Sequence, residues 1–87
     1  MENNGEQLIG KVIHYYGKIG VAIVALQDSL KVGDTVRFAG NMEEFEEVIG
    51  SMEVERQKIS EAHAGDEVGV KVGKKVKEGT QVYRISA

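Results

Sequence analysis

The 87-residue sequence contains no cysteine and no proline. Without cysteine no disulfide can stabilise the chain, and secreted domains of this size usually need such bridges, so we expect a cytoplasmic protein. A chain this short buries only about 60% of the surface that its unfolded form exposes, which allows one domain with a thin stability margin. Without proline, the 11 glycines must provide nearly all of the turn geometry.

Long apolar runs and an excess of basic charge are missing as well. The longest apolar run spans residues 21–26, far short of a membrane span. The polar start of the chain is not followed by an apolar run, so we expect no signal peptide and no membrane partner. The net charge of −3 argues against wholesale wrapping of nucleic acid, although it leaves room for a local basic patch.

The sequence does contain a strand pattern that recurs after glycine-led turns. In residues 59–72 a Gly-Asp turn is followed by valines that alternate with glycine or charged residues. β-Branched residues with a period of two are typical of a half-buried strand. Residues 32–38 and 78–82 repeat the arrangement of turn and strand. These segments predict an antiparallel all-β fold.

The same criteria predict further strands. We expect strands at residues 8–16, 21–26, 35–38, 43–54, 67–72 and 81–85. Residues 43–47 could instead start a helix on propensity alone, and Gly50-Ser51 suggests a bulge or bend. Six short strands predict a small closed barrel, since closure removes exposed sheet edges. We expect residues 1–6 to be a disordered tail and residues 7–87 to be the single β-barrel domain.

Several stretches resemble the second domain of translational GTPases, the barrel that follows the nucleotide-binding domain in elongation factor Tu. They are residues 30–36, 51–54 and 61–70, with residues 17–22 and 77–83 extending the match. The likeness to free-standing elongation-factor-like proteins is closer. The Gly-x-Val-x-His-Tyr-Tyr stretch at residues 10–16 also resembles the C-terminal barrel of collagenase-like peptidase-family proteins. The resemblance implies a six-stranded Greek-key barrel. The Gly-x-x-x-x-Gly-Lys-Ser/Thr loop is absent, which excludes GTP as a ligand of this chain alone.

The resemblance to elongation factor Tu also suggests a binding site, because this barrel helps to hold the aminoacyl end of tRNA in that family. The family's acidic residue there matches Glu53, and its basic residue matches Arg56. Glu53 could accept a hydrogen bond from a ribose hydroxyl, and Arg56 could meet a phosphate or stack on a base. Alternatively, both are ordinary outward residues. Tyr15 departs from the family's aliphatic pocket residue, and it could stack on a base or cap the core with Tyr16.

Charged residues cluster in two places. The basic run comprises Lys71, Lys74, Lys75 and Lys77, with Lys18 and Lys11 as possible neighbours. It could contact an RNA backbone, or it could be a solvated hairpin. The acidic run at residues 43–47 would repel RNA, or it serves only solubility. Within it we expect Phe45 to anchor the core.

We find no enzyme signature. No nucleophile lies beside a plausible base, and His14 and His63 have neither cysteines nor convincing carboxylates as partners. We therefore expect no catalytic residues, no metal and no cofactor.

The residues thus predict a non-catalytic binding module that contacts tRNA, rRNA or the ribosome. The candidate RNA-binding residues are Tyr15, Lys18, Glu53, Arg56, Lys71, Lys74 and Lys75. The alternative is an accessory module that docks on a separately encoded enzyme through an apolar patch near Tyr15, Ile19 and Tyr83. A third option is a self-associating barrel. Lysines and aromatics in one joint patch would favour RNA, whereas an exposed apolar patch with a polar rim would favour a protein partner.

Overall fold

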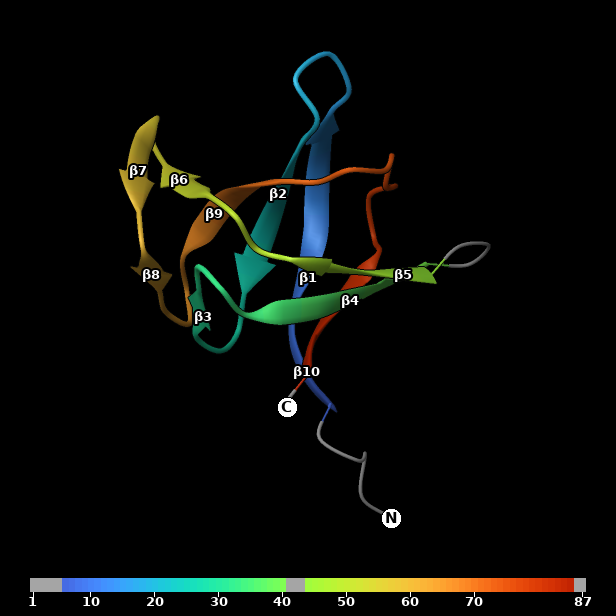
Figure 1. Ribbon diagram of the computed structural model, residues 1–87, viewed down its shortest axis with the longest axis horizontal. Coiled ribbons are helices and arrows are strands. Elements are labelled where there is room, and N and C mark those ends of the chain that lie inside the picture. Colours follow the sequence, from blue (N-terminus) through green and yellow to red (C-terminus); the bar gives the residue numbers. More distant parts are fainter. Residues whose placement is uncertain (1–5, 41–43, 86–87) are drawn as a thin grey trace.

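The computed structural model describes residues 6–40 and 44–85, and every regular element within these ranges is a β-strand (Figure 1). The strands are β1 (Glu6–Tyr16), β2 (Val21–Leu26), β3 (Leu30–Lys31), β4 (Thr35–Ala39), β5 (Glu44–Val48), β6 (Met52–Val54), β7 (Gln57–Ile59), β8 (Glu61–Ala62), β9 (Glu67–Lys71) and β10 (Gln81–Ile85). The predicted all-β class is confirmed. The described part contains no helix long and apolar enough to cross a membrane.

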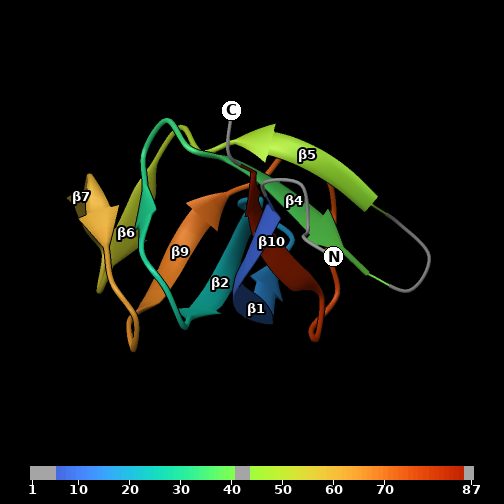
Figure 2. The same cartoon turned by 90° about the horizontal axis from the view of Figure 1, so that it is seen from below.

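One curled antiparallel sheet carries most of the fold. Its eight strands follow the order β5-β4-β10-β1-β2-β9-β6-β7, while β3 and β8 form a separate pair. Figure 2 shows how the sheet bends round so that β5 arches over β4 while β6 and β7 stand at the other end. The bounds of β2 and β10 coincide with the predicted ones. In β2 the buried residues Ala22, Val24 and Leu26 alternate with half-buried ones, whereas β10 has one buried residue, Val82.

The core lies on the concave side of this sheet. Ala22 and Val24 of β2 are fully buried, as are Val68 of β9 and Val36 of β4. The largest buried side chain is Phe38 of β4, which stacks on Phe45 of β5 with ring centroids 5.0 Å apart. Phe45 is half-buried and packs against the core, as the sequence predicted.

The predicted closure into a six-stranded Greek-key barrel is wrong. Among the described strands no pairing joins β5 at one end of the sheet to β7 at the other. The expected single strand at residues 43–54 is instead two strands, β5 and β6, on opposite sides of the sheet. Ile49 still bonds to the segment before β4, because its N–H donates to the Asp34 carbonyl and its own carbonyl accepts from Gly33, each at 2.8 Å. The break follows at Gly50 and Ser51, which belong to no strand and carry the chain on to β6.

Two other expectations differ from the structure. The predicted connection at residues 56–63 contains β7 and β8, which pair with β6 and β3. The predicted tail falls largely on residues 1–5, outside the described residues, whereas Glu6 already pairs with Ile85 of β10.

Strand β1 is the centre of the sheet and contains two irregularities. It pairs with β10 on one side and β2 on the other, and its register shifts between Leu8 and Gly10 and again between Val12 and His14. At Gly10 a Cβ atom would lie 2.6 Å from the Ala25 carbonyl oxygen, so only glycine fits there. The second shift leaves both Ile13 and His14 exposed, because a bulge adds a residue that the partner strand does not match.

Candidate functional site

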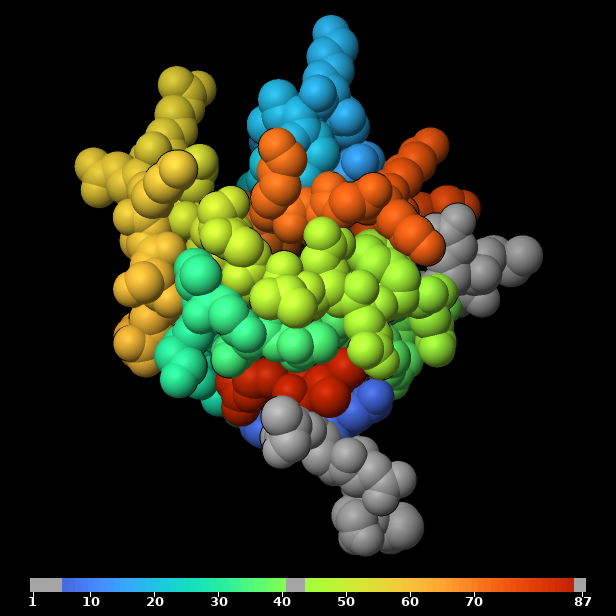
Figure 3. All heavy atoms as spheres, viewed as in Figure 1, coloured from blue at the N-terminus to red at the C-terminus, as the bar shows by residue number. Residues whose placement is uncertain are grey.

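The β1–β2 hairpin projects from the body of the molecule (Figures 1 and 3). It carries three large apolar side chains that are exposed. The exposed fractions are 59% for Ile19, 49% for Tyr16 and 37% for Ile13. The hairpin closes because the Tyr16 carbonyl accepts from the N–H groups of Ile19 and Gly20 at 3.3 and 2.9 Å. Gly20 has φ +67°, a left-handed conformation that glycine adopts without steric cost.

Half-buried side chains of β2 continue this apolar surface. Val21 lies opposite Tyr16, and Ile23 lies opposite His14. Both lean over Gly69 of β9, where a Cβ atom would meet Val21 Cγ1 at 3.2 Å and Ile23 Cδ1 at 3.5 Å. The absence of a side chain at Gly69 therefore leaves room for them.

We call this surface the hairpin patch. It comprises Ile13, Tyr16, Ile19, Val21 and Ile23. Two polar residues border the patch. The His14 ring packs edge-on against Tyr16, with ring centroids 4.4 Å apart, and the Lys71 side chain lies beside Gly20. Exposed apolar patches with polar rims mark interaction surfaces in proteins.

The predicted apolar patch is only partly this one. Ile19 belongs to the hairpin patch, but Tyr15 is half-buried and packs against the core. Tyr83 lies on β10, where the Arg37 guanidinium covers its ring at 4.7 Å. The three side chains therefore do not form one surface.

The candidate RNA-binding residues come from three projections of the fold. Lys18 lies in the β1–β2 turn, Arg56 in the β6–β7 turn, and Lys71, Lys74 and Lys75 at or after the end of β9. All five are exposed. In Figure 1 the β1–β2 and β6–β7 turns lie at the same end of the molecule, whereas the segment after β9 runs across it. No described residue forms an ion pair with any of them.

The remaining two candidates are placed differently. Glu53 is exposed in β6, opposite Lys58 of β7 and beside Gly69 of β9. Tyr15 offers less of its ring for stacking, because part of it packs against the core.

The acidic run proves to be structural as well as solvating. Glu44 forms an ion pair with Arg37 at 3.1 Å, and Glu47 accepts a hydrogen bond from the Gly73 N–H at 2.9 Å. The second contact holds the segment after β9 against β5. On the other side of that contact, Lys74 Nζ lies 5.6 Å from the centroid of the Phe45 ring.

Arg37 contacts two carboxylates at once. Its Nε and Nη2 donate to the two carboxylate oxygens of Glu6 at 3.0 and 2.7 Å, and Nη1 faces Glu44. The hydrogen bond from Arg37 lowers the pKa of Glu6, and the same bond raises the pKa of Arg37. With its donors committed to carboxylates, Arg37 serves to join β1, β4 and β5.

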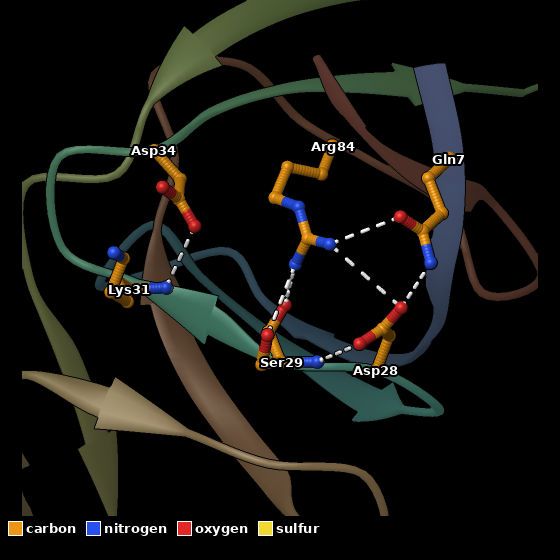
Figure 4. Close-up of polar contacts among 6 residues, drawn as sticks. All are labelled: Gln7, Asp28, Ser29, Lys31, Asp34 and Arg84. Atoms are coloured by element: carbon orange, nitrogen blue, oxygen red, sulfur yellow. Dashed lines mark hydrogen bonds and ion pairs between the residues drawn. The ribbon is translucent and has the colours of Figure 1, made fainter. Parts of the chain in front are cut away.

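Arg84 makes a second set of polar contacts near the ends of the described chain (Figure 4). It donates to the carbonyl and the hydroxyl of Ser29 and, at 3.1 Å, to Gln7 Oε1. Asp28 accepts from Gln7 and lies 3.8 Å from Arg84 Nη2. The cluster ties β10 to β1 and to the loop between β2 and β3, so it holds the fold together.

Neither histidine has the surroundings of a catalytic or metal-binding group in the described structure. The His14 ring lies 3.3 Å from the Glu78 carboxylate on an exposed surface. The backbone N–H of His63 donates to the Asp66 carboxylate in a tight turn. Within residues 6–40 and 44–85 no three side chains of His, Asp or Glu come together as a metal site would require.

Sequence reasoning missed Ile13, Tyr16 and the roles of Arg37 and Arg84. Alternation already places Arg37 on the outer face of β4, but its partner Glu6 is known only once β10 is placed between β1 and β4. The exposure of Ile13 depends on a bulge, which alternation alone does not reveal.

The fold and the hairpin patch define a small all-β domain with a surface suited to docking, and comparisons with known proteins agree with that class. A solved C-terminal domain of a putative U32 peptidase from Geobacillus thermoleovorans superimposes with a TM-score of 0.84 at 25% identity, covering 99% of both chains. Its selenomethionine variant gives a TM-score of 0.83 at 26% identity, covering 87% of this chain and 96% of that one.

A curated relative points the same way. An uncharacterised protease of Methanocaldococcus jannaschii is 40% identical over 76 residues, which is 86% of this chain. The match spans only 19% of that protease, so this chain corresponds to about a fifth of its length. No protein-family model matches the chain.

These relatives match the resemblance to collagenase-like peptidase proteins and not the resemblance to elongation factor Tu. The translation-factor motifs rest on Gly-Asp turns that lead into short strands. Such turns recur wherever the backbone needs positive φ before a strand, as at Gly33, Gly65 and Gly79. They therefore carry little information about the family.

Proposed function

We propose that this chain is a non-catalytic accessory module that docks on a protein partner through the hairpin patch. The partner we infer is a catalytic domain of the peptidase type, whether separately encoded or part of a longer chain. The single observation that carries the proposal is the solvent exposure of Tyr16, Ile19 and Ile13 on one projecting hairpin.

The chemistry of the patch supports a protein partner over a nucleic acid. Interfaces are anchored by a few aromatic and aliphatic side chains that become fully buried, and a polar rim keeps water out. Burying apolar surface contributes roughly 25 cal/mol per Å², so three large side chains supply a useful part of a binding energy. The likeness to C-terminal domains of a putative U32 peptidase supports the choice of partner.

Ile19→Asp tests the proposal, because it places a charge in the middle of the patch without disturbing the core. Val32→Asp is the matched control, since Val32 is also an exposed apolar residue outside a regular strand, with 42% of its surface exposed. Both variants should keep the unfolding midpoint of the wild type. The tagged protein should capture a peptidase-type protein from native lysate of its source, insensitive to ribonuclease, and only Ile19→Asp should lose it.

Two outcomes would oppose the proposal. The first is equal capture by Ile19→Asp and wild type. The second is capture that ribonuclease abolishes, which would favour RNA contacts through the cations at the three projections. In that case Arg56→Ala and Lys74→Ala should reduce recovery of RNA, with a steep dependence on salt.

A further inference from the structure

A groove of about 1040 Å³ lies apart from the hairpin patch, between the ends of β4 and β10 and the segment that leads into β10. Its sides come from strands β1, β4, β5 and β10 and from residues 75–80. Three lysines line it: Lys11 from β1, and Lys75 and Lys77 from the segment before β10.

The groove has an apolar base. Phe45 is half-buried and supported from below by its stack on Phe38, and Val76 is buried beside the lysines. The base is held in place, because Glu47 bonds the Gly73 N–H and Lys74 lies over the Phe45 ring. A pre-positioned surface loses less conformational entropy when a ligand binds.

The charges in this groove are unbalanced, although the whole chain is acidic. Its lining holds four cationic side chains and two carboxylates: Lys11, Arg37, Lys75 and Lys77 against Glu44 and Glu78. Glu44 is paired with Arg37 at 3.1 Å, and Glu78 lies 3.3 Å from the His14 ring. None of the three lysines is paired with a carboxylate of residues 6–40 or 44–85. The described lining of the groove therefore carries more positive than negative charge.

We infer that this groove binds an extended acidic peptide segment, with an apolar side chain of the segment against the exposed part of Phe45 and its carboxylates facing Lys11, Lys75 and Lys77. A short peptide is chosen over a nucleic acid because the whole chain carries a net charge of −3, which opposes a polyanion whose phosphates extend beyond the groove. If the acidic segment belongs to the docking partner, the inference rests on the proposed function. Peptide binding by the groove is tested separately.

The probe is a short fluorescein-labelled peptide in which glutamates flank a central leucine, titrated with the whole chain and followed by fluorescence anisotropy. The double variant Lys75→Glu with Lys77→Glu should weaken binding by about tenfold, since each exposed charge contact contributes little and two are reversed. Binding should also weaken as salt is raised. The matched control is Lys18→Glu with Lys31→Glu, which makes the same charge change at exposed sites outside the groove and should bind as the wild type does.

Chemical shifts identify the site independently of affinity. The peptide should shift the amide signals of residues 75–81 and leave those of Ile19 and Gly20 in place. Ile19→Asp should bind the peptide normally, so failure of the docking proposal and failure of the groove proposal give different results. The inference is overturned if the glutamine version of the peptide binds equally well, or if both double variants lose binding equally. It is also overturned if a single-stranded RNA of equal charge displaces the peptide at a lower concentration.

Discussion

Arg37 and Arg84 each use one guanidinium group to join strands that are far apart in the sequence. Arg37 on β4 reaches Glu6 on β1 with two parallel hydrogen bonds, across Tyr83 of the intervening strand β10. Arg84 on β10 reaches the loop after β2 through Ser29. A planar, always charged fork suits such two-oxygen contacts, which a lysine would not reproduce.

The contact between Arg37 and Glu6 predicts a dependence of stability on pH. The pKa of Glu6 is lower in the folded protein than in the unfolded chain, so its contribution is fully present above the ordinary pKa of a glutamate. That contribution is lost as the pH falls through the folded value. Glu6→Gln should therefore reduce the free energy of unfolding at pH 7, and the difference from wild type should disappear in acid, as measured by urea denaturation.

Glu67→Gln is a suitable control for that prediction, because Glu67 is exposed and lies opposite Ala25 and not opposite a cation. It should change the unfolding free energy little at either pH. A difference for Glu6→Gln that stays constant from neutral to acid pH would contradict the assigned ion pair.

At the scale of elements, the fold is a series of hairpins, and the β6–β7 hairpin is the one under backbone strain. Val54 pairs with Gln57, which leaves Glu55 and Arg56 as a two-residue turn with φ of 52° and 68°. Two successive left-handed residues make a type I′ turn, where Asn-Gly is preferred. Placing ordinary residues there costs roughly 1–2 kcal/mol each.

Combining Glu55→Asn with Arg56→Gly should therefore stabilise the protein by about 1 kcal/mol or more, because the new residues tolerate positive φ. The measurement is the urea midpoint of unfolding. Gly33→Ala provides the opposite control: Gly33 has φ +100° with no atom near a Cβ, so this change should destabilise through backbone conformation alone. If the turn variant were no more stable than wild type, the strain would not reside in this turn.

Over the described residues the main sheet is open, because its end strands β5 and β7 do not pair with each other. Residues 49–51 carry the chain from β5 at one end of the strand order towards β6 near the other. The inner strands β1, β2 and β9 are paired on both sides, while β7 is paired on one side only. Stability should therefore be unevenly distributed.

Native-state amide exchange followed by NMR should reveal this distribution. We expect the slowest exchange at Ala22 and Val24 of β2, which are fully buried between two paired strands. We expect the fastest exchange among strand residues in β7, the three-residue strand at the end of the sheet. Uniform protection of β2 and β7 would mean that the sheet opens only as a single unit.

Much of the fold could be predicted from local patterns. A continuous apolar run gave the bounds of β2, and glycine placed the bend near residue 50. Closure could not be predicted, because it depends on whether β5 and β7, at the two ends of the strand order, pair with each other. The candidate site was predicted only at Ile19, since the exposure of Tyr16 and Ile13 depends on the bulge and on which strands lie beside the hairpin.

The sequence by itself therefore determined the class of the fold, most of its strands and the residues that face the core. It did so because the side-chain period of a strand and the positive φ of a glycine turn are local properties. Only the tertiary structure decided which outward-facing side chains remain exposed to solvent and which charged side chains form ion pairs. Those properties depend on the neighbours that a strand acquires from distant parts of the chain, as Arg37 acquires Glu6 and Tyr16 acquires none to cover it.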